Sequence, residues 1–132
     1  MKANKIILSL ALLLPIFLLG CSSGKAGTTT TESKPPTAAE VLEEDQDADI
    51  FRWENTIYKT GVDWVDELNL TKQEEIGRIS SVYKKNEKHE FQAGMATKLP
   101  KGTKLYSVKG RTDVLLAEVD GITKKYLALA EG

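Results

Sequence analysis

The sequence contains few of the residues from which catalytic and metal sites are usually built. Among its 132 residues are one cysteine and one histidine, so an intrachain disulfide is excluded and the fold must depend on its hydrophobic core. A zinc site needs three or four closely spaced His, Cys or acidic ligands, and we expect no bound metal and no cofactor. The histidine, His89, is interpreted as a solvent-exposed loop residue.

The chain also shows no arrangement typical of an enzyme. A serine or cysteine nucleophile would need a histidine base held by an acid, and His89 lies among flexible charged neighbours. Facing carboxylates, as in glycoside hydrolases, would require two acids that meet in space. The candidates are Asp63, Asp66, Glu118 and Asp120, each more simply an exposed residue of a helix or turn. We therefore expect that the protein is not an enzyme.

The apolar run near the start of the chain is too short to cross a bilayer. Residues 6–19 form a run of 14 residues, whereas about 20 are needed to span the hydrocarbon core, and Pro15 is a further handicap to a continuous helix. Lys2 and Lys5 precede the run. A basic start followed by a short apolar run is typical of a secretory signal peptide, which we place at residues 1–20.

The apolar run ends in Leu18-Leu19-Gly20-Cys21, with the one cysteine of the sequence at its last position. This tetrapeptide resembles the lipobox of bacterial lipoproteins, although Leu19 is larger than the usual residue before glycine. The resemblance implies cleavage before Cys21, a diacylglyceryl group on its thiol and an acyl group on its new amino terminus. Since two acyl chains give a stable anchor where one is marginal, we expect the protein on the extracytoplasmic face of the cell membrane. The alternative is a cleaved soluble form.

Residues 22–49 are small, polar or acidic and are predicted to form a flexible linker. They contain seven acids and two lysines, whereas residues 50–132 contain 12 acids and 14 bases. A Pro35-Pro36 pair and short polar runs favour an extended chain, although residues 38–44 are compatible with a few helical turns. We therefore assign residues 21–49 to the lipidated cysteine and its linker, and residues 50–132 to one small globular α+β domain, mostly antiparallel sheet.

The first half of this domain is predicted to contain a hairpin and a short helix. Residues 50–53 and 56–59 are rich in β-forming residues and are separated by a two-residue turn. Residues 62–70 have the spacing of an amphipathic helix of about two turns, with Trp64 packed in the core. Residues 71–85 are compatible with a helix, but we favour a turn at 71–75 followed by a strand over 76–83.

The last third of the domain predicts an antiparallel meander of three strands. A turn at residues 99–102 has proline at its second position and glycine at its fourth. Strands are expected at residues 104–108, 114–119 and 122–129. A loop over residues 110–113 joins the first two strands, and an Asp-Gly turn, a strong hairpin signal, joins the last two.

Four stretches of the domain carry a further resemblance. They are Trp53 to Tyr58, residues 76–79, residues 96–106 and Tyr126 to the closing Glu131-Gly132. Together they resemble the globular part of small lipoproteins of Gram-positive bacilli. The resemblance covers most of the domain and implies an envelope location and a similar fold. None of these stretches is catalytic in character.

Basic residues are concentrated between positions 84 and 111, which hold eight lysines and arginines against two glutamates. Lys98, Lys101 and Lys104 are the candidate contacts to an anionic polymer of the envelope, and scattered solvated faces are the alternative. We expect a monomeric binding or accessory module that meets an envelope protein or anionic polymer, and not nucleic acid. Capture of a small ligand is the alternative function, and an envelope hydrolase is a more remote one.

Overall fold

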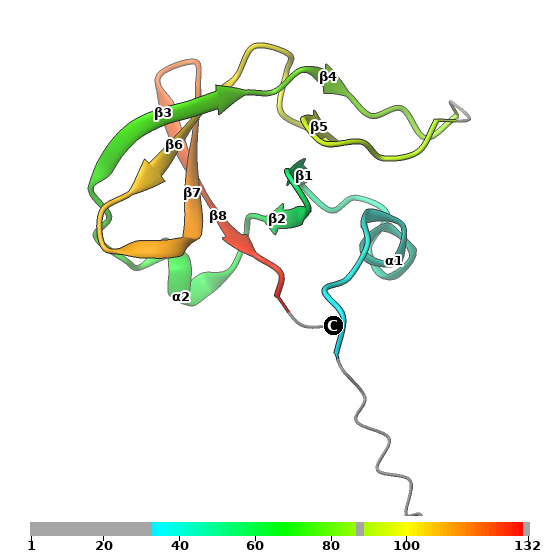
Figure 1. The fold of residues 1–132 in the computed structure, drawn as a ribbon, viewed down its shortest axis with the longest axis horizontal. Helices are drawn as coiled ribbons and strands as arrows, with labels where there is room; N and C mark the ends of the chain where they lie inside the picture. Colours follow the sequence, from blue (N-terminus) through cyan, green and yellow to red (C-terminus); the bar gives the residue numbers. More distant parts are fainter. Residues whose placement is uncertain (1–32, 87–88, 131–132) are drawn as a thin grey trace, which may run out of the picture. The chain divides into compact units, whose positions relative to one another are not determined.

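The computed structural model describes residues 33–86 and 89–130, so the expected signal peptide and Cys21 lie outside the described residues. The described chain is mostly β-sheet with short helices (Figure 1). All but one of its strand pairings are antiparallel, the exception being β4 with β5. The expected α+β class with a largely antiparallel sheet is therefore confirmed at this level.

The elements follow one another along the chain with short connections. They are α1 (Ala38–Glu44), β1 (Ile50–Trp53), β2 (Thr56–Lys59), α2 (Asp63–Asp66), β3 (Lys72–Arg78), β4 (Ser81–Val82), β5 (Met95–Ala96), β6 (Lys104–Val108), β7 (Arg111–Val119) and β8 (Ile122–Ala128).

The eight strands form one curled sheet in the order β3-β6-β7-β8-β2-β1-β5-β4. Its two outermost strands, β3 and β4, are consecutive in the chain and are separated by Ile79 and Ser80 only. The Ile79 amide donates to the Thr103 carbonyl oxygen, on the β6 side, and the Ser80 amide donates to the Gly94 carbonyl oxygen, on the β5 side. One continuous segment thus changes partners midway and joins both ends of the sheet, which leaves few exposed edges.

The predicted hairpin of β1 and β2 is confirmed in its register. Phe51 faces Tyr58 and Trp53 faces Thr56 across the pair. The turn residue Glu54 has a φ of 55°, the left-handed conformation that a two-residue hairpin turn requires.

Residues 71–85 form strands, and the helical alternative for them is wrong. The turn expected at 71–75 is also wrong, because β3 already begins at Lys72 and pairs with β6 with two register shifts. Gly77 has a specific packing role in β3. A Cβ atom at this position would overlap the indole of Trp53, so the glycine lets the ring lie directly against the strand.

The three-stranded meander β6-β7-β8 is confirmed. Both residues of the Asp-Gly turn have a positive φ, 50° for Asp120 and 78° for Gly121. This is expected for a type I′ turn, which joins two strands through a two-residue loop. The loop expected at 110–113 is largely wrong, since β7 begins at Arg111. The turn expected at 99–102 lies one residue later, where the Thr103 amide donates to the Pro100 carbonyl oxygen.

The helix predicted at 62–70 is reduced to the four residues of α2. Val65 is buried against the outer face of the meander with Val108, Val114 and Leu116. The prediction that Trp64 packs in the core is wrong, because its side chain is 48 % exposed. Adjacent residues of an α-helix point about 100° apart, so Trp64 points away from the meander when Val65 is directed at it.

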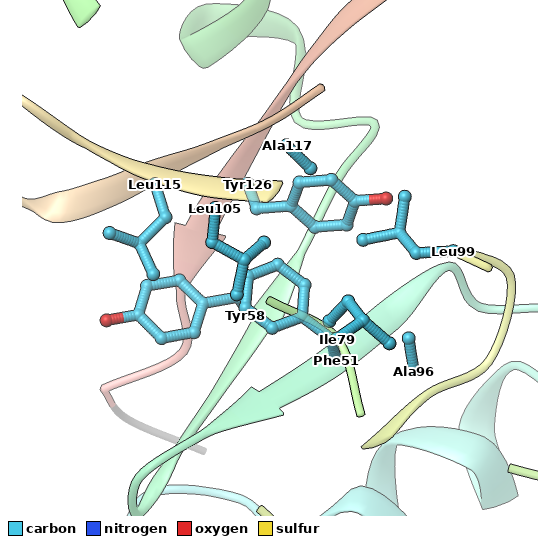
Figure 2. Packing of buried hydrophobic residues seen from close by; sticks show 9 residues of the cluster. All are labelled: Phe51, Tyr58, Ile79, Ala96, Leu99, Leu105, Leu115, Ala117 and Tyr126. Carbon is cyan, nitrogen blue, oxygen red and sulfur yellow. The ribbon is translucent and has the colours of Figure 1, made fainter. Parts of the chain in front are cut away.

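The main core fills the inside of the curled sheet (Figure 2). The rings of Phe51 and Tyr58 stack with centroids 5.1 Å apart, and Tyr126 meets Phe51 edge-on at 4.9 Å. Leu105 and Leu115 complete the cluster around these rings. Alternation along each strand sends the neighbouring side chains to the outer face, where α1 and α2 cover separate smaller clusters.

Helix α1 belongs to the packed structure, although its residues were expected to lie in the linker. Ala38 and Val41 are buried and pack with Ile50 and Ile57 of the first hairpin, beside which α1 lies in Figure 1. A capping box holds the helix start: the Glu40 amide donates to Thr37 Oγ1, and the Thr37 amide donates to Glu40 Oε2. The packed part of the chain therefore begins before the boundary expected at residue 50.

Candidate functional site

The three lysines proposed as polyanion contacts are all exposed but lie in different settings. Lys101 is in the turn between Pro100 and Thr103. Lys104 is on β6, directly opposite Arg78 of β3 on one side and Glu118 of β7 on the other. Lys98 instead lines a groove beside α1. The three side chains are therefore distributed over a strand, a turn and a groove.

The groove that contains Lys98 is here called the α1 groove. It places Lys98, a contact predicted from the sequence, beside residues that the sequence did not single out. It has a volume of about 430 Å³. Its lining residues come from α1 and the turn after it, from the segment after β4 and from the segment after β5: Ala39, Leu42, Glu43, Gln46, Tyr83, Lys85, Thr97 and Lys98.

Polar contacts hold the walls of the α1 groove in place. Lys85 Nζ donates to Gln46 Oε1 at 3.0 Å, which ties the segment after β4 to the end of α1. Thr97 Oγ1 donates to the Ala48 carbonyl oxygen at 2.7 Å and accepts from the Ile50 amide at 3.0 Å. No described residue forms an ion pair with Lys98. Its ammonium group is therefore available to a ligand at the rim.

Tyr83, which lines the α1 groove, belongs to a pair of aromatic rings. Tyr83 packs against Phe91 with centroids 4.9 Å apart and the rings tilted by 45°. Phe91 itself lines a second groove beside α1, with a volume of about 460 Å³. There Arg52 donates from Nη1 to the Phe91 carbonyl oxygen and from Nε to the Glu54 carbonyl oxygen, both at 3.0 Å. These bonds tie the arginine to the surrounding backbone.

A polar cluster next to the main core connects the start of β1 to β8. The Tyr126 hydroxyl donates to Asp49 Oδ1 at 2.8 Å, and Lys124 Nζ forms an ion pair with Asp49 Oδ2 at 2.7 Å. Burial, and then the bond to the Asp49 carboxylate, raise the pKa of Tyr126 above its ordinary value of 10.0. A neutral tyrosine in this place is a fixed hydrogen-bond donor, so the cluster has a structural role.

The four carboxylates considered as hydrolase candidates are divided among α2, β7 and the β7–β8 turn. Glu118 is occupied by Lys72 at 2.8 Å, Asp63 and Asp66 belong to α2, and Asp120 is in the β7–β8 turn. His89 is exposed. Within residues 33–86 and 89–130, no group of three or more His, Cys, Asp or Glu is arranged to hold a metal ion.

Exposed Trp64 is accompanied by an arginine. The Arg111 guanidinium lies 5.3 Å from the centre of the indole ring and bonds Asp113 with both Nε and Nη2, at 2.9 and 2.7 Å. The bond from Arg111 lowers the pKa of Asp113. The cation–π contact explains how a short helix keeps a large ring half outside the core.

No family model matches the chain, and searches of curated proteins and of solved structures likewise return no match. None of the helices described here is long and apolar enough to cross a membrane.

Sequence reasoning found Lys98 but missed the groove around it. Leu42, Glu43 and Gln46 were interpreted as linker because acids dominate their surroundings. A signal was present: Thr37 and Glu40 fit the capping-box spacing, and Ala38, Val41 and Leu42 follow at helical intervals. Tyr83 and Lys85 could not be placed beside α1, because no local pattern relates segments about 40 residues apart.

Proposed function

We propose that the protein is a lipoprotein, anchored through Cys21 to the extracytoplasmic face of the cell membrane, where it acts as a binding or accessory module. The observation that carries the proposal is the position of the one cysteine in the sequence, directly after a short apolar run with a basic start. An exported chain with a single cysteine needs a use for that thiol. Lipid attachment supplies one and agrees with the resemblance of residues 18–21 to a lipobox.

The test of the anchor is Cys21→Ala, with Ser22→Ala as the matched control. Incorporation of an alkyne-labelled fatty acid and sedimentation with membranes are measured for both variants and the parent. Since the acyl chains supply the membrane affinity, Cys21→Ala should lose the label and appear in the soluble fraction, while Ser22→Ala should behave like the parent. If Cys21→Ala still sediments with membranes, the proposed anchor is wrong.

The binding role is supported by two separate features, the α1 groove with Lys98 and the exposed Lys101 and Lys104 outside it. Lys98, Lys101 and Lys104 are exposed, and Lys98 lies at a concave surface that Tyr83 also lines. If these lysines contact an anionic envelope polymer, retention of the protein on isolated cell walls should decrease with salt. Replacing all three with glutamine should remove this salt dependence, and unchanged retention would exclude the polymer contact.

Capture of a small ligand is the second candidate, and one observation favours it. The two grooves beside α1 have volumes of about 430 and 460 Å³, within the range of small-molecule sites. A domain of this size was expected to have little room for such a site. The curled sheet leaves its inside filled by the core, so these grooves exist only because α1 packs on the outside.

A further inference from the structure

We infer that the α1 groove binds a small amphiphilic carboxylate, that is, one carboxylate group attached to a compact apolar group. The inference rests on the proposed binding role and specifies its ligand. Three features of the groove support it: lining residues with a net charge of +1, apolar lining residues that include one aromatic ring, and a backbone fixed by hydrogen bonds.

The charge of the groove fits a single carboxylate. Its lining contains two ammonium groups, Lys85 and Lys98, and one carboxylate, Glu43, which leaves one net positive charge. Lys85 uses one of its three donors on Gln46 and keeps two for a ligand. No described residue pairs with Lys98. A polyanion would place further negative charge near Glu43 without a cation to balance it, and like charges at short range repel.

The apolar part of the groove fits the second half of such a ligand. Its lining includes Ala39 and Leu42 of α1 and Tyr83 from the segment after β4. Because Phe91 backs Tyr83 at 4.9 Å, the ring is supported on one face by a second aromatic side chain. A planar or branched apolar group that contacts Leu42 and Tyr83 would be removed from water and would gain van der Waals contacts. Inorganic phosphate or a purely polar chain would gain neither.

The frame of the groove is held by bonds that do not need a ligand. Thr97 is fixed by its bonds to the Ala48 carbonyl oxygen and the Ile50 amide, and Ala96, which precedes it, is paired with Phe51 in the sheet. Lys98 therefore starts from a fixed backbone position. A site whose backbone is fixed before binding loses less conformational freedom when it binds.

The experiment uses the whole chain in detergent micelles and three soluble probes followed by ligand-observed NMR. 3-Phenylpropionate combines a carboxylate with a compact apolar group, 3-phenylpropionamide has nearly the same shape without the charge, and inorganic phosphate has charge without the apolar group. Micelles without protein give the blank. We expect saturable binding of 3-phenylpropionate, weaker binding of the amide and none of phosphate.

Two substitutions locate the binding. Lys98→Gln and Lys85→Gln should each raise the Kd for 3-phenylpropionate about two- to fivefold, as expected for a partly solvated ion pair, and should leave the Kd for the amide unchanged. Lys101→Gln and Lys104→Gln are matched controls outside the groove and should not change either Kd. Far-ultraviolet circular dichroism checks that all four variants stay folded.

The outcomes separate this inference from the proposed function. Equal Kd values for 3-phenylpropionate and its amide, or equal effects of the groove and control lysines, overturn the inference. Tighter binding of phosphate than of 3-phenylpropionate also overturns it, and favours the polymer contact instead. None of these results depends on Cys21, so the anchor stands or falls in its own labelling experiment.

Discussion

The inside of the curled sheet and the outer face under α1 differ in the size and type of their buried side chains. Inside, three aromatic rings lie in contact and Phe51 and Tyr126 are completely buried. Under α1, the helix contributes only Ala38 and Val41 as buried side chains, and a groove lies at each of its sides. The interior therefore holds the two largest fully buried side chains of the described chain, whereas the face under α1 is more thinly packed and is bordered by grooves.

Phe51→Ala should have the largest effect, because it removes a buried ring that contacts both Tyr58 and Tyr126. We expect a loss of about 3–5 kcal/mol in the free energy of unfolding, measured by urea denaturation followed by circular dichroism. Val41→Ala, the corresponding truncation under α1, should cost clearly less because it removes two methyl groups instead of an aromatic ring. Equal losses at the two positions would contradict the division into a stable interior and a thinly packed face.

Gly77→Ala should be the next largest change. Its new Cβ would overlap the Trp53 indole, so the ring or β3 must move, and overpacking of this kind typically costs about 1–3 kcal/mol. Gly61→Ala is the control, since a Cβ there meets nothing within 4 Å and only its φ of 83° is unfavourable. Because the left-handed φ at Gly61 by itself costs about 1–2 kcal/mol for alanine, the deciding quantity is the loss in Gly77→Ala itself. A loss close to zero would show that the Trp53 ring moves aside without cost.

Tyr126→Phe tests how the interior responds to pH. The pKa of Tyr126 is raised in the folded state by burial and by Asp49, so its stabilising contribution is complete below the unfolded value of about 10 and decreases as pH rises above it. The free energy of unfolding should therefore fall above about pH 10, and Tyr126→Phe should reduce this slope. A slope that is unchanged in the variant would show that other groups cause it.

Thr37→Ala should have the smallest global effect and the most local one. It removes the side-chain acceptor of the capping box, which typically stabilises a helix start by about 1 kcal/mol. Hydrogen exchange should become faster at the amides of α1 and stay unchanged in β6, β7 and β8. Faster exchange throughout the sheet would mean that α1 is part of the same cooperative unit as the interior.

The sequence predicted the elements whose signals are local. The β1–β2 hairpin, the meander and the Asp120-Gly121 turn all have strand residues next to turn residues, and each was confirmed. Trp64 was misplaced because amphipathic spacing does not show which of two adjacent apolar residues faces the core. The sequence does not predict the start of β3, because residues 72–74 have a weak strand propensity, which pairing with β6 overrides.

The candidate site was only partly accessible from sequence for a related reason. Lys98 could be singled out as one of several basic residues, but its groove joins segments around positions 42, 83 and 98, and such distant contacts leave no periodic pattern. The linker interpretation of residues 38–49 also had a physical basis, since acids reduce the apolar surface available for packing. Two small buried side chains and a capping box were sufficient to place α1 on the sheet.

The sequence by itself determined the local signals: the apolar run before Cys21, the two tight hairpins and the strands that join at them. These depend on neighbouring residues, whose spacing is already present in the chain. Only the tertiary structure decided that β3 and β4 join the two ends of one sheet, that Trp64 lies outside the core, and that α1 forms a groove with Tyr83 and Lys98. Those outcomes depend on which distant surfaces exclude water together, and that is settled when the whole domain packs.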